Sequence, residues 1–349
     1  MAIISCNNKV VLISGITGYI AGRIGYNLLQ KGYIVRGTTR RQHSADALLN
    51  GAYRDYADRV QILAVPDMAR VGAFDEAVKG VHGIIHTASP IDFTRLKSWD
   101  DFVGVAVAGV LGILESASKY ADPQLESVVL TSSVAAVMDS SKINHTFTEA
   151  DWNDWAESKC LELGNQAPAG ILYSASKAAA EKAFWKFGRD NKVTWTQAAV
   201  QPGVVGGPPI ELPPTADSLN ETLKPIWEIF SGETRMPPGI GSNTYIDVRD
   251  VADMHVWCVE HPKESAGQRY MLVSGLAPPQ AYADILHKAY PDRTMMTQGT
   301  PGAGYASGFT FPKDRSNFSA AKAQKTLGRS FISVEQSVLD TAKVFERYL

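Results

Sequence analysis

The chain has 349 residues, 45% of them hydrophobic, which is enough for a large core with a smaller second lobe. Its formal net charge of −2 gives no global basic field, so we expect a small-molecule partner and neither nucleic acid nor a membrane. Three cysteines, Cys6, Cys160 and Cys258, are odd in number and far apart, which argues against a disulfide framework. The first residues lack the basic and apolar segments of a signal peptide, so we expect a cytoplasmic protein.

Short β-branched runs alternate with helical patterns as far as residue 200. The predicted strands are 10–14, 34–39, 60–65, 83–87, 127–132 and 193–200, and the predicted helices are 19–31, 45–54, 73–79, 99–120 and 173–191. This alternation predicts a parallel sheet with crossover helices, and therefore a Rossmann-type doubly wound α/β fold. Gly32 is expected to cap the end of the first helix.

The sequence becomes rich in proline and glycine after residue 203, which is typical of a smaller, loop-rich lobe. Residues 245–260 are predicted as a strand and a helix that return to the main sheet, so the lobe is discontinuous. We expect a dinucleotide-binding domain over 1–202 plus 242–264, and a substrate-binding lobe over 203–241 plus 265–349. Ser333 is the predicted N-cap of a closing helix that ends near residue 348.

The first strand runs directly into the turn Gly15-Ile-Thr-Gly18 and then into a helix. Glycine at such a turn lets a pyrophosphate approach the backbone, and the helix N-terminus supplies donors and a favourable dipole for it. The alternative is an ordinary tight turn between strand and helix. The cofactor contacts expected at this turn are Gly15, Thr17, Gly18, Tyr19 and Ile20.

The end of the second strand bears on the choice between NAD and NADP. It reads Arg40-Arg41, with no Asp or Glu before Asp46. Because a guanidinium can donate two hydrogen bonds to a phosphate, we expect Arg40, helped by Arg41, to bind the 2′-phosphate of NADPH/NADP+. The alternative is two solvated loop arginines. Asp67, after the third strand, is expected either to accept from the adenine amino group or to cap a helix.

Three residues could supply the chemistry of carbonyl reduction, which needs a polarising donor and an acid. Tyr173 precedes Lys177 by four residues, so both lie on one helix face and the ammonium would favour the ionised phenol. We predict Tyr173 as general acid, Lys177 as the cation that lowers its pKa and binds ribose hydroxyls, and Ser133 as the donor to the carbonyl. Ser132 is the rival for the last role, since adjacent strand residues face opposite sides.

These motifs, with His86-Thr-Ala-Ser-Pro90 and Tyr245-Ile-Asp-Val-Arg-Asp, resemble those of extended short-chain dehydrogenases/reductases. The resemblance is to fungal NADPH-dependent carbonyl, aldehyde and methylglyoxal reductases, which are similar to plant dihydroflavonol reductases. It implies NADPH-dependent reduction of aldehydes and ketones by an oxidoreductase. The further cofactor contacts that it implies are Asp67, Met68, Thr87, Ala88, Ser89, Gln201, Pro202 and Gly203.

The sequence departs from this family at two places. Many relatives carry an asparagine in the fourth helix that holds a water of the proton relay, and residues 106–109 contain none. Proton supply would then reach Lys177 by another route. The additional basic residue shortly after the phosphate-binding arginine is also absent, with His43 and Ser44 at that place.

Three other interpretations are weighed against a reductase. One is an epimerase or dehydratase on nucleotide sugars with NAD, one is a non-catalytic NADPH-binding sensor, and one is a metal site formed by His82 and His86 or by Cys258 and His261. Arg40 argues against the first, the intact catalytic residues against the second, and the lack of a joining carboxylate cluster against the third, so we expect no metal. Aromatic residues in the lobe favour an apolar or aromatic carbonyl substrate, and we expect a monomer or homodimer. These aromatic residues are Trp227, Phe230, Tyr305, Phe309 and Phe311.

Overall fold

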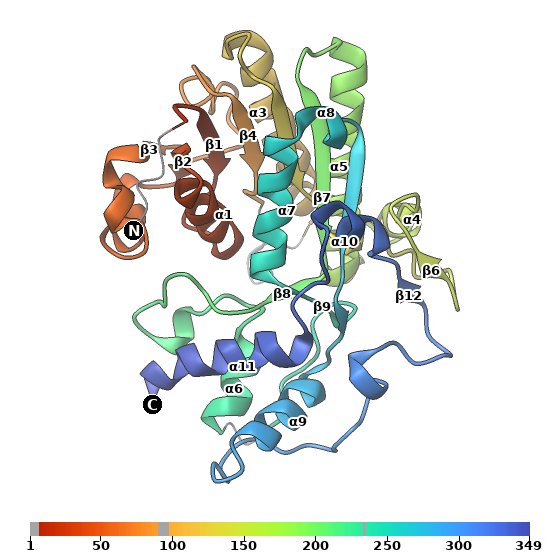
Figure 1. The fold of residues 1–349 in the computed structure, drawn as a ribbon. Helices are drawn as coiled ribbons and strands as arrows, with labels where there is room; N and C mark the ends of the chain where they lie inside the picture. Colours follow the sequence, from red (N-terminus) through yellow and green to blue (C-terminus); the bar gives the residue numbers. More distant parts are fainter. Residues whose placement is uncertain (1–6, 90–97, 233–234) are drawn as a thin grey trace. The chain divides into compact units, whose positions relative to one another are not determined.

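The computed structural model describes residues 7–89, 98–232 and 235–349 (Figure 1). Contacts divide the chain into two compact units. Unit 1 comprises Met1–Ser141, Glu149–Gln201 and Ala252–Tyr270, and unit 2 comprises Lys142–Thr148, Pro202–Val251 and Met271–Leu349. Each unit is therefore assembled from segments that are far apart in the sequence.

A seven-stranded sheet has the order β10-β7-β5-β4-β1-β2-β3, and the neighbouring strands from β3 through β7 run parallel. This confirms the Rossmann-type α/β fold. The central strands β1, β4 and β5 are nearly continuous apolar runs, as is typical of parallel strands that are covered on both faces. Their bounds are β1 Val10–Ser14, β2 Ile34–Thr39, β3 Val60–Ala64, β4 Gly83–His86, β5 Ser127–Thr131, β7 Thr196–Pro202 and β10 Gln268–Leu272.

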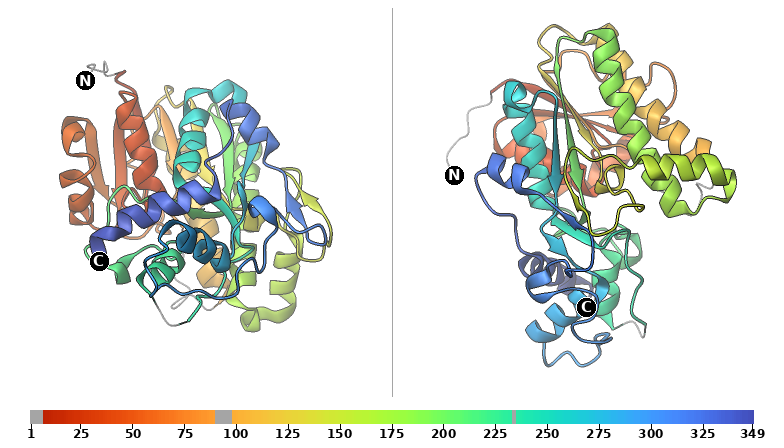
Figure 2. Two further views of the ribbon diagram at one scale, coloured as in Figure 1. Left: turned by 60° about the horizontal axis from the view of Figure 1, so that its bottom comes forward. Right: turned by 90° about the vertical axis from the view of Figure 1, so that its right-hand side faces the viewer.

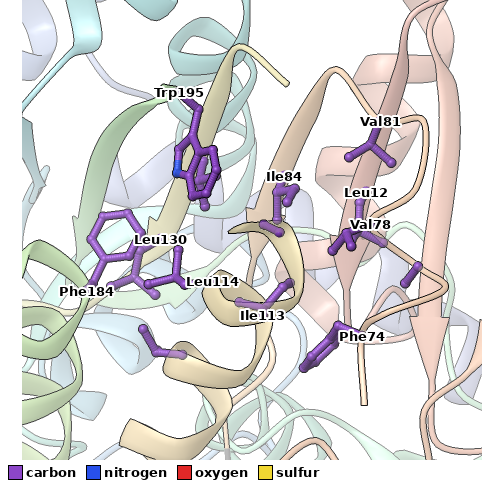
Figure 3. Close-up of a cluster of buried hydrophobic side chains, with 14 of the residues drawn as sticks. Leu12, Phe74, Val78, Val81, Ile84, Ile113, Leu114, Leu130, Phe184 and Trp195 are labelled. Atoms are coloured by element: carbon purple, nitrogen blue, oxygen red, sulfur yellow. The ribbon is translucent and has the colours of Figure 1, made fainter. Parts of the chain in front are cut away.

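Helices α3 (Val105–Tyr120) and α5 (Ala169–Asn191) lie side by side on one face of this sheet, with α1 (Tyr19–Gln30) and α7 (Val248–Glu260) on the other (Figure 2). Between the sheet and α3 lies a large buried core. Figure 3 shows members of it from strands, loops and helices. Those labelled are Leu12, Phe74, Val78, Val81, Ile84, Ile113, Leu114, Leu130, Phe184 and Trp195.

The segment from Asp100 to Tyr120 is long and apolar enough to cross a membrane by length and composition. It begins with a π-helical turn at Asp100–Gly104 and continues as α3. Half of its most apolar window is buried inside the protein, and α3 packs along α5. The segment is therefore placed as a core helix.

The remaining helices of unit 1 are short: α2 Asp46–Asn50, α4 Asp154–Leu163 and α8 Pro262–Ser265. The helix predicted over 73–79 is wrong, because this segment forms consecutive turns. Gly72 and Gly80 bound it with positive φ angles of 73° and 68°, so the backbone departs from the right-handed helical conformation at both ends of the segment. Phe74 and Val78 are nevertheless buried four residues apart, which explains the helical pattern in the sequence.

In unit 2, a three-stranded sheet has the order β11-β9-β8, with β8 Val204–Gly206, β9 Thr244–Asp247 and β11 Gly275–Leu276. The expected return of the strand near residue 245 to the main sheet is therefore wrong. Tyr245 is buried, and its hydroxyl is hydrogen-bonded to that of Ser337 at 2.8 Å. Both residues belong to unit 2, so this contact holds β9 within that unit. The seventh strand of the main sheet is β10, which follows later in the chain.

Short elements complete unit 2. They are β6 Thr146–Phe147, which pairs with β12 Asn317–Phe318, and the helices α6 Lys224–Ser231, α9 Pro279–Ala289, α10 Ala321–Leu327 and α11 Val334–Phe345. The predicted N-cap of α11 is confirmed, because the Ser333 side chain accepts from the Gln336 N–H at 3.1 Å. Gly32 follows Lys31, the C-cap residue of α1, and has a φ of 88°, as expected for the glycine that ends a helix.

Candidate active site

The glycine turn forms a backbone cradle at the start of α1. Gly15 has a φ of 70°, and a Cβ there would lie 3.4 Å from the Cβ of Ala88. Gly18 is the N-cap of α1, with no side-chain hydrogen bond at the cap and no acidic residue in the first turn. Thr17 and Gly18 are exposed, and Tyr19 and Ile20 are half-buried. The turn thus presents an uncapped helix N-terminus, which suits an anion.

Ser14 fixes the loop after β4 against this turn. Its hydroxyl accepts from the Thr87 and Ala88 N–H groups, both at 3.0 Å, and lies 2.9 Å from Nδ1 of His86. With two N–H groups donating to it, the hydroxyl is left to donate to His86. The imidazole is fully buried, which lowers its pKa to about 3, so it is neutral. Thr87 also donates to the Ser14 carbonyl.

The residues after β2 and β3 lie at the same edge of the sheet. Arg40 and Arg41 are exposed directly after β2. The exposed Asp67 accepts from the Ala69 N–H at 2.9 Å and so stabilises its own turn. Met68 turns inward against the core, with its terminal methyl only 2.1 Å from where a Cβ on Gly109 would lie.

Tyr173, on α5, is half-buried and its side chain is hydrogen-bonded to that of Ser133, directly after β5. Burial raises the pKa of the Tyr173 phenol, and the hydrogen bond with Ser133 lowers it. The net shift is upward, because the effect of burial is larger than that of the hydrogen bond with Ser133.

Lys177 lies one helical turn after Tyr173 and its side chain is buried, with its Nζ 5.8 Å from the centre of the Tyr173 ring. The ammonium donates to the Ser89 hydroxyl at 3.1 Å. Burial lowers the pKa of Lys177 to about 8, and the nearby Glu181 carboxylate acts in the opposite direction. The lysine is therefore poised to change charge near neutral pH.

Ser132 and Ser133 have different partners. The Ser132 hydroxyl donates to Glu181 at 2.5 Å, while Ser133 is hydrogen-bonded to Tyr173. The structure thus brings Ser133, rather than Ser132, to the phenol. Gln201, predicted to contact the cofactor, is buried and donates to Glu181 at 3.0 Å.

Two further residues predicted to contact the cofactor follow in unit 2. Pro202 is buried at the end of β7, and the half-buried Gly203 donates its N–H to the Leu272 carbonyl at 3.0 Å.

Sequence reasoning missed Glu181 altogether. The signal was present, because Glu181 follows Lys177 by the same spacing of four that singled out Tyr173 and Lys177.

A family profile described as the NAD dependent epimerase/dehydratase family matches residues 11–273. The chain belongs to this family. It is 34% identical to the NADPH-dependent methylglyoxal reductase GRE2 of Saccharomyces cerevisiae, over 95% of this chain and 96% of that protein. It is 31% identical to aldehyde reductase 2 of Sporidiobolus salmonicolor, over 95% of this chain and 94% of that protein.

Among solved structures, the chain is similar to yeast methylglyoxal/isovaleraldehyde reductase Gre2 in complex with NADPH. The TM-score is 0.84, with 32% identity, over 97% of this chain and all of that one. The expected family and fold are therefore confirmed. The chain also spans nearly the whole length of these relatives.

Proposed function

We propose that this chain is a cytoplasmic NADPH-dependent carbonyl reductase that converts an aldehyde or ketone to an alcohol. The observation that carries the proposal is the cluster of Ser133, Tyr173 and Lys177 in the same unit as the glycine turn. The NADPH-dependent reductases among its relatives support the choice of reaction. Of the described residues, Cys160 and Cys258 are buried and form no disulfide, which supports an intracellular location.

The residues present fit a dinucleotide phosphate. The space beside Gly15 is one that a side chain would fill, and the first turn of α1 carries no side chain that would repel a pyrophosphate. Arg40 and Arg41 are exposed after β2, and the sequence has no Asp or Glu between them and Asp46 that would disfavour a 2′-phosphate. Bound there, NADPH would supply the hydride.

The three catalytic side chains have different roles. Tyr173 delivers a proton to the carbonyl oxygen as negative charge develops on it, and Ser133 donates a hydrogen bond to the same oxygen. The upward shift of the Tyr173 pKa keeps the phenol protonated before the reaction, as a general acid must be. Lys177, as ammonium, stabilises the phenolate that remains after proton transfer and binds ribose hydroxyls.

Proton supply uses a group other than a helix asparagine, because residues 106–109 contain none. Of the described residues, Ser89 is the hydrogen-bond partner of the Lys177 ammonium, and it is half-buried. A hydroxyl can accept a proton from one side and donate one to the other. We therefore assign Ser89 as the group that would relay a proton from solvent to Lys177.

The substrate is an apolar or aromatic carbonyl compound. In unit 2, Tyr305 and Phe309 are half-buried and stacked with ring centres 5.2 Å apart, which leaves apolar surface for a ligand. Phe230 is fully buried and serves the packing of that unit instead. Trp227 packs edge-on against Phe345.

An isotope experiment tests this function. Reaction with NADPH deuterated at the transferred position should place deuterium on the carbinol carbon of the alcohol product, as read by mass spectrometry. An epimerase would return its substrate or an epimer without consuming NADPH, and a sensor would bind NADPH without product. Either result would contradict the proposal.

A further inference from the structure

A carboxylate without any solvent exposure lies behind the proposed catalytic residues. Glu181 is on α5, one turn after Lys177 and two turns after Tyr173, so the three share a helix face. Its oxygens accept from Ser132 at 2.5 Å, from Gln201 at 3.0 and 3.1 Å, from Trp185 at 3.2 Å and from Arg269 at 2.6 Å. These donors come from β7, β10, α5 and the end of β5.

Arg269, which forms the ion pair with Glu181, is itself fixed. Its Nη1 donates to the carbonyl oxygens of Glu149 at 2.5 Å and Asp151 at 2.8 Å, and its guanidinium lies 3.7 Å over the ring of Trp152. Desolvating two charges is costly, and a buried ion pair is often replaceable by apolar side chains without loss of stability. The pair is therefore poorly explained by stability alone.

The contacts of Glu181 point to the reacting groups instead. Ser132, which donates to it, is bonded through the chain to Ser133, and Ser133 is hydrogen-bonded to the phenol of Tyr173. Lys177 is the second cation near Glu181, and the carboxylate raises the pKa of this lysine against the effect of burial. The carboxylate thus acts on two of the three residues.

We propose that Glu181 is a positioning residue of this active site, which anchors the end of β5 through Ser132 and holds Lys177 in its charged form. The inference rests on the proposed function for the meaning of the site. Its physical content, a carboxylate that controls the charge of Lys177, does not depend on any reaction. The test below uses that independence.

The other groups that face Lys177 do not replace this role. Tyr173, on the same helix, is a neutral phenol with a raised pKa. His86 of β4 is a neutral imidazole, so it does not lower the pKa of Lys177. Ser89, after β4, is an uncharged acceptor. Of the described residues named in these interactions, Glu181 alone brings a negative charge to the lysine.

The experiment measures the pKa of Lys177 directly in the ligand-free protein. The rate of acetylation of Lys177 by acetic anhydride, followed across pH by peptide mass spectrometry, reports the fraction of free amine. Glu181→Gln should lower this pKa by about one unit, since an opposite charge nearby is lost. Arg269→Gln should raise the pKa of Lys177, because Glu181 then has Lys177 as its remaining cation. If Glu181 had only a structural role, the two variants would not shift this pKa in opposite directions.

Arg269→Lys is the matched control. It keeps the positive charge and loses the forked contacts with the two backbone carbonyls, so it should lower the melting temperature and leave the pKa of Lys177 in place. Fluorescence titration with NADPH gives a second measurement. As the pH is raised, the affinity for NADPH should begin to fall at a lower pH in the Glu181→Gln variant than in the wild type. Unchanged acetylation profiles in both Gln variants would overturn the inference.

The two proposals fail separately. If the wild type reduces no carbonyl compound while the pKa of Lys177 moves as stated, the reductase function is wrong and the control of Lys177 by Glu181 stands. If carbonyl reduction is observed while the pKa does not move, the role of Glu181 alone is wrong.

Discussion

Replacing Tyr173 by phenylalanine removes the proposed acid and almost nothing else. The ring is kept, and the lost hydroxyl has Ser133 as its partner in a half-buried place, so we expect a loss of about 1 kcal/mol in the free energy of unfolding. Loss of a general acid typically costs about 10²- to 10⁴-fold in rate. This equals about 2.7–5.4 kcal/mol of activation free energy.

The assay measures kcat and KM for NADPH oxidation with a reducible carbonyl compound, and NADPH affinity by fluorescence. We expect Tyr173→Phe to lose kcat by that factor and to keep its affinity for NADPH. Tyr53→Phe is the matched control, because it removes a buried hydroxyl that donates to the Gly22 carbonyl at 2.7 Å. It should cost stability and keep kcat. A kcat for Tyr173→Phe within about threefold of the wild type would refute the acid role.

Further predictions concern pH, cofactor choice and packing. Because burial lowers the pKa of Lys177 to about 8 and the ammonium is the active form, kcat/KM should fall as the pH rises through that value; a pH profile that stays flat would contradict this. Arg40→Ala should weaken NADPH binding by at least about tenfold and leave NADH binding nearly unchanged, as measured by fluorescence titration. A Cβ at Gly37 would lie 2.6 Å from the Cβ of Ile16, so Gly37→Ala should lower the unfolding free energy by about 1–3 kcal/mol in urea denaturation; an unchanged unfolding free energy would contradict this close approach. Phe184→Ala should cost about 3–5 kcal/mol, because this buried ring fills the core between α5 and the sheet; a loss below 1 kcal/mol would contradict the packing described.

Much of unit 1 could be predicted from the sequence, because its signals are local. A β-branched run that enters Gly15-Ile-Thr-Gly18 has few structural outcomes, and β1 and α1 begin where the pattern places them. The prediction of a helix over 73–79 was wrong because it relied on a local pattern alone. Its apolar spacing is helical, but the backbone departs from the helical conformation at Gly72 and Gly80, and the segment between them forms turns.

Non-local partners decided the features that the sequence could not supply. Nothing near Tyr245 shows that β9 pairs with β8 and β11 instead of the main sheet, since that choice depends on Ser337, far along the chain. The direction of the pKa shift of Tyr173 depends on how deeply folding buries the phenol. The spacing from Lys177 could have pointed to Glu181, but its contacts with Ser132, Gln201 and Arg269 come from segments that the sequence does not place together.

The most direct test of the proposed function is the loss of NADPH absorbance when the purified protein is mixed with a panel of aldehydes, α-dicarbonyls and aryl ketones. NADH is run in parallel. The proposed function predicts oxidation of NADPH, faster than that of NADH, with at least one carbonyl compound and formation of the matching alcohol in equal amount. Tight binding of NADPH with no oxidation by any member of the panel would contradict it.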